Sequence, residues 1–232
     1  MSADETPPLG PDDVHIWWAR PDQARLCTSE VLDADERGRH AAYRQQVDKD
    51  RFLIGCTLIR HAMTTYLGAV GPVDRACTGC GKPHGKPRVA GLELSVSHSG
   101  ERVALAVART VAVGVDVEKL SRALDDDALI ARVLTPAEAA RVSGLPAAER
   151  PQAFLRHWTR KEAVVKATGE GLRAELSAFG VGDGTVDWPA RPALSAGCRL
   201  YDLSPGDGHA GALAVLSPAE VKVTELVWEP LR

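Results

Sequence analysis

The residues most suggestive of chemistry are two carboxylates in the segment Gly114-Val-Asp116-Val-Glu118, at the end of an apolar run. Side chains two residues apart on a strand point to the same face, so Asp116 and Glu118 are expected side by side. Neighbouring carboxylates repel each other unless a cation or a group of donors lies between them. Mg²⁺ suits this role because it shares carboxylate, water and phosphate oxygens. A solvated strand end beside Lys119 is the alternative.

A third carboxylate, Glu162, lies four residues before Lys166 in the segment Trp158-Thr-Arg-Lys-Glu162-Ala-Val-Val-Lys166. On a helix this spacing places both side chains on one face, where an exposed pair contributes a few tenths of a kcal/mol. Trp158 lies one turn before Glu162, which puts the pair at the border of the buried face. Glu162 and Lys166 therefore suit a metal and phosphate site, with an ordinary surface pair as the alternative.

The segment Ser95-Val-Ser97-His98-Ser99-Gly100 predicts a strand that runs into a turn. It lacks the GxSxG pattern of a serine hydrolase, so a nucleophilic serine is not indicated. His98 could donate a hydrogen bond to a phosphate, and Ser97 offers a hydroxyl and a backbone N–H. A purely structural histidine is the alternative.

These residues must be positioned by both helices and strands. Apolar residues spaced by three and four predict a helix from about residue 36 to 66, which can accommodate a break, and two shorter helices at 135–142 and 151–167. β-Branched and alternating apolar residues predict strands at 14–19, 92–96, 103–108, 111–117, 210–216 and 221–227. The order of these elements predicts an α/β (α+β) fold, with residues 1–12 as a flexible N-terminal tail.

The composition is that of a soluble globular protein, with 44% apolar and 25% charged residues and a net charge of −3. That near balance argues against a nucleic-acid-binding protein. No run approaches the ~20 apolar residues that span a bilayer, and the acidic, proline-rich start is unlike a signal peptide. We expect a cytoplasmic protein without membrane contact.

Five cysteines make a disulfide framework improbable in a reducing compartment. Cys77 and Cys80 form a CxxC pair followed by His84, and these residues offer three of the four ligands of a structural zinc site. Because no second pair appears, the sequence favours an ordinary turn in this Gly- and Pro-rich loop, and replacing both cysteines by serine is expected to change little.

The segments SVSHSG, GVDVE and WTRKEAVVKATGEGL, in this order and spacing, resemble the 4′-phosphopantetheinyl transferases of the Sfp type, in their W/KEA variety. His84-Gly-Lys86-Pro87 and the segment from Arg51 to Arg60 add to the resemblance. It extends over roughly residues 14 to 216.

The resemblance implies a pseudo-twofold fold of two similar halves, here residues 13–110 and 111–232, with coenzyme A bound between them. A weak echo between His98–Val107 and His209–Val215 agrees with such a duplication. Because the two halves are fused in one chain, a monomer would suffice.

The resemblance also implies a Mg²⁺-dependent enzyme of the holo-[acyl-carrier-protein] synthase type. It would transfer the phosphopantetheine arm of coenzyme A to a serine of an apo acyl, peptidyl or aryl carrier protein and release 3′,5′-ADP. The holo carriers would serve polyketide, nonribosomal peptide or fatty acid synthesis.

Each implied role falls on a matching residue of this sequence. Asp116, Glu118 and Glu162 would bind the metal; Asp116, Glu162 and Lys166 would be catalytic; and Arg51, Lys86, Ser97, His98 and Lys166 would bind coenzyme A. Two rivals remain: a non-catalytic coenzyme A or nucleotide-binding module, and a zinc-stabilised interaction protein built around Cys77, Cys80 and His84.

Overall fold

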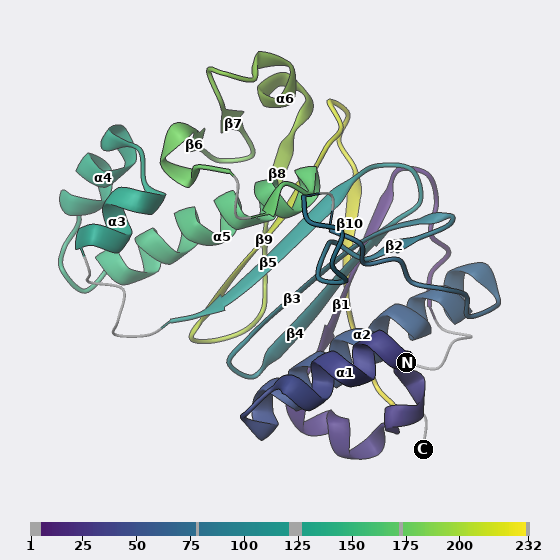
Figure 1. The fold of residues 1–232 in the computed structure, drawn as a ribbon. Coiled ribbons are helices and arrows are strands. Elements are labelled where there is room, and N and C mark those ends of the chain that lie inside the picture. Colours follow the sequence, from purple (N-terminus) through teal and green to yellow (C-terminus); the bar gives the residue numbers. More distant parts are fainter. Residues whose placement is uncertain (1–5, 78, 121–126, 172–173, 231–232) are drawn as a thin grey trace. The chain divides into compact units, whose positions relative to one another are not determined.

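A computed structural model describes residues 6–77, 79–120, 127–171 and 174–230 (Figure 1). The chain divides into two compact units. The N-terminal unit runs to Thr110 and resumes at Val221, and the C-terminal unit runs from Val111 to Glu220. Each unit is a sheet packed with helices, as the mixed α+β prediction required.

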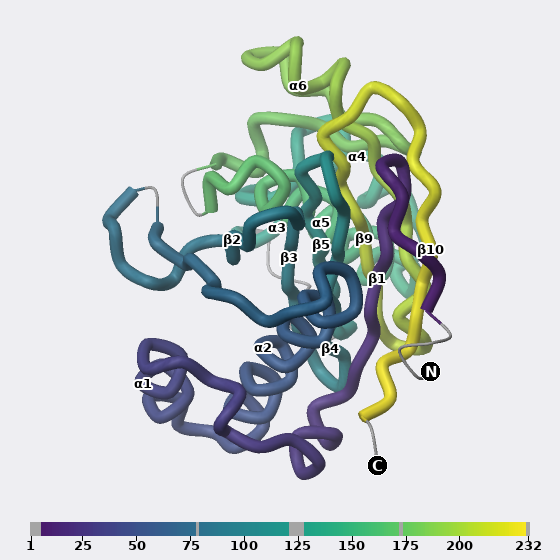
Figure 2. The backbone as a smooth tube through the Cα atoms, turned by 90° about the vertical axis from the view of Figure 1, so that its right-hand side faces the viewer, coloured from purple at the N-terminus to yellow at the C-terminus, as the bar shows by residue number. Residues whose placement is uncertain are grey.

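The sheet of the N-terminal unit has the strand order β10-β1-β4-β3-β2. Its strands are β1 (Asp13–Ala19), β2 (Arg88–Val89), β3 (Leu92–Ser99), β4 (Arg102–Ala108) and β10 (Lys222–Val227). All neighbours are antiparallel except β1 and β10, which are parallel although one begins the chain and the other ends it. Figure 2 shows these two strands, purple and yellow, side by side.

Two helices and two short 3₁₀ turns accompany this sheet: α1 (Ala34–Ala42), α2 (Gln46–Leu67), η2 (Pro21–Leu26) and η3 (Ser29–Val31). The expected break in the long helical segment falls at Tyr43, whose backbone is extended. The apolar face of α2, including Phe52 and Ile59, joins β3 and β4 in one buried core. Helix α1 is tied to α2 by Arg60, which donates to both carboxylate oxygens of Glu36.

The C-terminal unit contains an antiparallel sheet of order β5-β9-β8, formed by β5 (Val113–Lys119), β8 (Arg199–Leu203) and β9 (His209–Val215). Helix α5 (Arg150–Thr168) packs across β5 and β9. The smaller elements of the unit are α3 (Asp127–Val133), α4 (Pro136–Ser143), η6 (Leu176–Ala178), β6 (Gly180–Val181), β7 (Val186–Asp187) and α6 (Pro192–Gly197).

The two units repeat one pattern, which confirms the expectation of two similar halves. In the first, β1 is followed by α2, β3 and β4, with β4 in the middle of the three strands; in the second, β5 is followed by α5, β8 and β9, with β9 in the middle. The echoing sequences at 103–107 and 211–215 lie on the two middle strands. His98 and His209 are not equivalent, because His98 lies on β3 and His209 begins β9.

Two boundaries expected from the sequence are corrected. The C-terminal strand β10 belongs to the N-terminal unit, because it returns to pair with β1. Residues 6–12 are not a loose tail: Leu9 is buried, Arg109 donates to its carbonyl at 2.9 Å, and Thr110 donates to that of Pro11. Residues 1–5 lie outside the described part of the chain.

Helix α3 and strand β8 were not predicted, since both are short and irregular in apolar spacing. Among the described helices, none is both long and apolar enough to span a membrane.

Candidate active site

A lysine–carboxylate contact joins α5 to β5 in the C-terminal unit. The Nζ of Lys166 lies 2.6 Å from Oδ1 of Asp116, and the Asp116 side chain is almost fully buried while that of Lys166 is 30% exposed. Strand alternation places Gly114, Asp116 and Glu118 on one face of β5. That face meets α5, because a Cβ at Gly114 would lie 2.0 Å from the carbonyl oxygen of Ala163.

Glu162 shares this environment, one helical turn before Lys166. Burial raises its pKa, the nearby charge of Asp116 raises it further, and Lys166 lowers it in part. Ionising both carboxylates therefore still costs free energy, because a single lysine does not fully offset their burial and mutual repulsion. The structure therefore brings together Asp116, Glu162 and Lys166, as the sequence predicted for a charged site.

Glu118 lies two residues further along β5, half-buried near the end of the strand. It is opposite Ala210 in the register, whereas Asp116 is opposite Ala212. Both cross-strand neighbours are alanines, whose side chains carry no charge or hydrogen-bonding group. Carboxylate oxygens are the ligands that Mg²⁺ prefers, but among the described residues the oxygens of Asp116, Glu118 and Glu162 do not all lie within 4.8 Å of one another, so side-chain movement would be needed for all three to share one ion.

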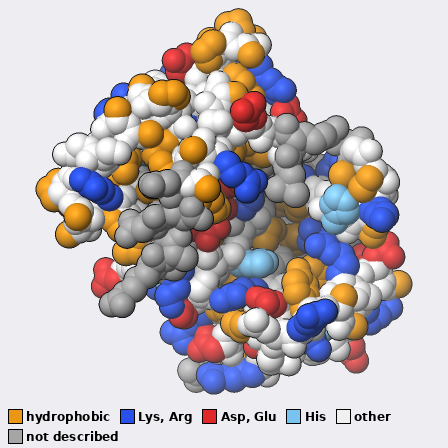
Figure 3. All heavy atoms as spheres, turned by 60° about the vertical axis from the view of Figure 1, so that its left-hand side comes forward, with side chains coloured by type: hydrophobic (Ala, Val, Ile, Leu, Met, Phe, Trp, Pro, Cys, Tyr) orange, Lys and Arg blue, Asp and Glu red, His pale blue; other side chains and the backbone are white. Residues whose placement is uncertain are grey.

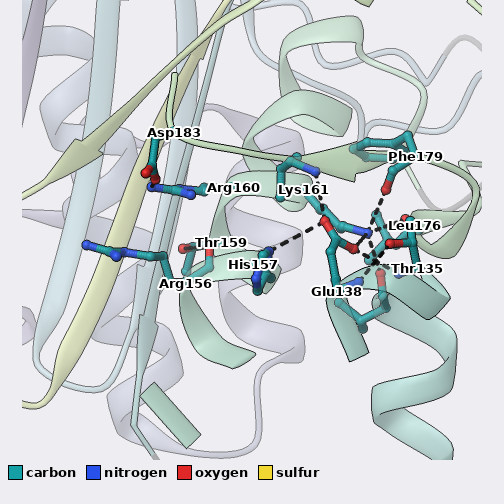
Figure 4. A network of polar contacts seen from close by, with 12 residues as sticks. Thr135, Glu138, Arg156, His157, Thr159, Arg160, Lys161, Leu176, Phe179 and Asp183 are labelled. Carbon is teal, nitrogen blue, oxygen red and sulfur yellow. Dashed lines mark hydrogen bonds and ion pairs between the residues drawn. The ribbon is translucent and has the colours of Figure 1, made fainter. Parts of the chain in front are cut away.

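Lys161 precedes Glu162 in the sequence but has a different environment. Its Nζ is fully buried, 2.6 Å from Oε2 of Glu138 on α4, and it donates to the carbonyls of Val133, Leu176 and Phe179 at 2.6 to 2.9 Å. Figure 4 shows these contacts converging on the ammonium group. All its donors are used, so Lys161 is a structural residue that links α5, α4 and the segment at 176–179.

Glu138 completes this network. Burial acts to raise its pKa, but hydrogen bonds from His157, Lys161, Val181 and Thr135 outweigh burial and lower the pKa to about 2. Thr135 and Glu138 also form the capping box that starts α4. The sequence predicted the capping box, but it did not show that Glu138 also pairs with Lys161.

Apart from Lys166, the residues predicted to bind coenzyme A lie in the N-terminal unit. Ser97 and His98 are near the end of β3, where Ser97 is buried and His98 is exposed. Arg51 on α2 donates from Nε and Nη2 to the carbonyl of Gly100, at 3.1 and 2.8 Å. The structure thus brings Arg51 to the turn that follows His98. On the face drawn in Figure 3, basic side chains (blue) lie beside histidines (pale blue).

Lys86 lies near the opposite end of β3. Its Nζ is 4.0 Å from Oε2 of Glu93, and burial lowers its pKa while Glu93 partly opposes that shift. Glu93 and His98 are five positions apart on β3, which corresponds to about 17 Å of backbone. The contact with Glu93 thus associates Lys86 with the first half of β3, whereas His98 lies near the end of this strand.

Gly114 is a positioning residue that sequence reasoning did not identify. Besides the Ala163 carbonyl, a Cβ there would lie 2.3 Å from the backbone nitrogen of Ala167. No side chain fits, so the glycine allows α5 to approach β5 closely enough for Lys166 to reach Asp116. Its place two residues before the acid, on the same strand face, was the available signal.

Comparisons with known proteins point to one family. The family model of the 4′-phosphopantetheinyl transferase superfamily matches residues 112–200, the stretch that includes β5 and α5. HetI, a 4′-phosphopantetheinyl transferase of Nostoc sp., is 32% identical over 210 residues that cover 88% of each chain.

Other relatives have the same description. The 4′-phosphopantetheinyl transferase AcpT of Escherichia coli K12 is 30% identical over 76% of this chain and 79% of its own length. The 4′-phosphopantetheinyl transferase psf-1 of Bacillus pumilus is 29% identical over 83% and 82%. A holo-(acyl-carrier-protein) synthase of Bacillus anthracis, solved with CoA (3′,5′-ADP), is a weaker match in structure, with a TM-score of 0.38, 20% identity and coverage of 47% of this chain and 98% of its own.

Proposed function

Because the chain belongs to the 4′-phosphopantetheinyl transferase superfamily, we propose that it transfers the phosphopantetheine arm of coenzyme A to a serine of an apo acyl, peptidyl or aryl carrier protein. The serine oxygen forms a bond to the β-phosphorus, and the bond from that phosphorus to the bridging oxygen breaks. The bridging oxygen leaves with 3′,5′-ADP. The observation that carries this proposal is the grouping of Asp116, Glu162 and Lys166 between β5 and α5.

The carboxylates of Asp116, Glu118 and Glu162 are the residues that would hold Mg²⁺. When bound, Mg²⁺ supplies positive charge to the pyrophosphate oxygens as the bridging bond breaks. The environment suits a cation, because the pKa of Glu162 is raised by burial and by the charge of Asp116. Lys166 pairs with Asp116, and its partly exposed ammonium group would contact a phosphate oxygen of the substrate.

Glu162 is the candidate general base. It accepts the proton of the serine hydroxyl at a carboxylate oxygen, and its raised pKa makes it a stronger base than an ordinary glutamate. Lys166 stabilises the negative charge that develops on the leaving oxygen.

Arg51, Lys86, Ser97 and His98 are the candidate residues for binding the nucleotide part of coenzyme A. Lys86 contacts Glu93 in the first half of β3 and His98 lies near the end of this strand, which favours a long ligand with several charged groups over a single phosphate. Coenzyme A has this character, with an adenine, a 3′-phosphate and a pyrophosphate in succession.

The deciding experiment is mass spectrometry of an apo carrier protein incubated with this chain, coenzyme A and Mg²⁺. We expect the carrier mass to increase by one phosphopantetheine group, and no increase with Asp116→Asn or without Mg²⁺. The control Asp183→Asn alters an exposed carboxylate that pairs with Arg160, a residue of the same helix α5 that carries Glu162 and Lys166. This variant should retain transfer. Coenzyme A binding in calorimetry with no mass increase on any carrier tested would favour the non-catalytic binding module instead.

We also propose that the protein acts as a monomer, because the repeated pattern supplies both halves within one chain. Light scattering after size-exclusion chromatography tests this, and a stable dimer at micromolar concentration would contradict it.

A further inference from the structure

The loop before β2 contains a cluster that the transferase chemistry does not use. Cys77 and Cys80 lie with His84 in a set whose sulfur and ring nitrogen atoms are all within 4.8 Å of one another. The Sγ of Cys80 is 3.0 Å from Nε2 of His84. All five cysteines of the chain are thiols, so no disulfide joins Cys77 to Cys80.

The backbone is already folded around this cluster. Gly81 donates to the carbonyl of Cys77, and Cys77 donates to the carbonyl of Lys82, both at 2.8 Å. Gly81 has φ +71°, a left-handed conformation that glycine adopts without strain. The two cysteines are thus held at opposite sides of one tight turn, which directs both thiols to the same side as His84.

A backbone N–H donor also contacts one of the two thiols. The N–H of Gly79 points to the Sγ of Cys77 at 3.4 Å. A hydrogen bond from an amide stabilises negative charge on sulfur and so favours the form that binds metal. The exposed Cys80 and His84 leave the remaining side of the cluster open to solvent.

From this geometry we propose that Cys77, Cys80 and His84 bind one Zn²⁺, with solvent as the fourth ligand. A tetrahedral site with Zn–S of 2.3 Å and Zn–N of 2.0–2.1 Å places ligand atoms about 3.4 to 3.8 Å apart, and side-chain rotation is enough to reach this from the observed cluster. Binding releases the thiol protons to solvent and involves no change of oxidation state.

Zinc is selected over magnesium by the chemistry of the ligands. Thiolate sulfur and imidazole nitrogen favour Zn²⁺, whereas the carboxylates of Asp116, Glu118 and Glu162 favour Mg²⁺. The chain would then hold two different metals at two independent sites. The zinc would fix the turn at 77–84, which is otherwise closed by a few backbone hydrogen bonds.

The sequence alone favoured an ordinary turn here, because a closed zinc site uses four protein ligands and only three are present. The convergence of the three atoms reverses that preference, since an open fourth position is filled by solvent. Global unfolding on metal removal is still not expected, because the turn lies outside the buried core of the N-terminal unit.

Elemental analysis of the full-length protein, purified under reducing conditions and desalted, tests the proposal. We expect close to one zinc per chain in the parent and in Cys27→Ser, a matched control at a half-buried thiol elsewhere in the unit. The variant Cys77→Ser with Cys80→Ser should lose the zinc, and His84→Ala should bind it at least tenfold more weakly in a chelator competition. Replacement by Co²⁺ should give the intense visible absorption of a tetrahedral thiolate site in the parent.

Hydrogen exchange of residues 74–88 gives a second readout, because metal removal would leave exchange unchanged there if the turn bound no metal. We expect faster exchange there after zinc is removed, with the rest of the chain unaffected. The proposal is overturned by less than a tenth of a zinc per chain with no cobalt–thiolate spectrum, by zinc retained in the double serine variant, or by a native Cys77–Cys80 disulfide seen as a mass deficit of two hydrogens.

Discussion

Helix α5 presents two lysines to two acids at the same distance, with opposite consequences. Lys161 lies 2.6 Å from Glu138 and Lys166 lies 2.6 Å from Asp116. The first pair is fully buried and its lysine also donates to three carbonyls, whereas the second lysine is 30% exposed and has a further carboxylate, Glu162, beside it.

The difference shows how to tell a structural ion pair from a functional one. At Glu138 the hydrogen bonds outweigh the cost of burial, so its pKa is lowered to about 2. Burial also lowers the pKa of Lys161, and the contact with Glu138 opposes that shift only in part. At the other pair, burial and the charge of Asp116 raise the pKa of Glu162. The Glu138 carboxylate is thus stabilised by its hydrogen bonds, whereas an added cation would stabilise the ionised Glu162.

The largest expected effect is on transfer activity at the second site. Asp116→Ala should lower kcat/KM at least about 1000-fold, because it removes a metal ligand and the partner of Lys166. The melting temperature should stay near that of the parent. Steady-state transfer to an apo carrier, with Asp183→Asn as control, measures this, and near-normal activity of Asp116→Ala would show that the site is misassigned.

The next expected effect concerns the free energy of unfolding, for which the Glu138–Lys161 pair should matter more than the Asp116–Lys166 pair. Glu138→Gln should destabilise the fold by about 3–5 kcal/mol, because it leaves the Lys161 ammonium buried without its counter-charge. Asp116→Asn should cost clearly less, because its partner Lys166 is partly exposed to solvent and because the change relieves repulsion with Glu162. Denaturant unfolding of both variants tests this comparison. Equal losses would mean that burial does not distinguish the pairs.

The two glutamates should also give pH dependences of opposite sign. For Glu138 the folded pKa is about 2 and the ordinary value is 4.5. Its ionised form therefore adds about 3 kcal/mol of stability above pH 4.5, and this is lost as the pH falls toward 2. Glu162 has a raised folded pKa, so the folded state binds its proton more tightly, and stability from this group falls as the pH rises from the ordinary to the raised value.

Unfolding free energies of Glu138→Gln and Glu162→Gln, measured from neutral pH to about pH 3, check these signs. The advantage of the parent over Glu138→Gln should shrink on acidification, whereas the parent should gain relative to Glu162→Gln. If the stability difference between parent and variant changed in the same direction for both, the two glutamates would not differ electrostatically as described.

A smaller effect is expected where the backbone positions the second site. Gly114→Ala places a methyl group against the backbone of Ala163 and Ala167, which should cost about 1–3 kcal/mol and move Lys166 away from Asp116. Gly197→Ala, where no atom lies within 4 Å of the added methyl, is the matched control. Thermal melting and transfer assays should both decline for Gly114→Ala, and unchanged values would mean that α5 adjusts freely.

Much of the local structure could be predicted because it depends on near neighbours. The apolar spacing of α2 and α5, the capping box at Thr135 and the β-branched run of β5 each reflect interactions within a few residues. The same short range made Asp116 with Glu118, and Glu162 with Lys166, recognisable as pairs that share a face.

The tertiary structure decided everything that depends on the path of the chain. Lys161 and Glu162 are adjacent in sequence, yet only the positions of residues 133, 138, 176 and 179 show that Lys161 is enclosed. The return of β10 to β1 joins residues 13 and 222, and the turn at Gly81 brings two thiols to His84. Sequence periodicity describes which face a side chain takes, whereas what lies opposite that face is set by packing between segments far apart in the chain.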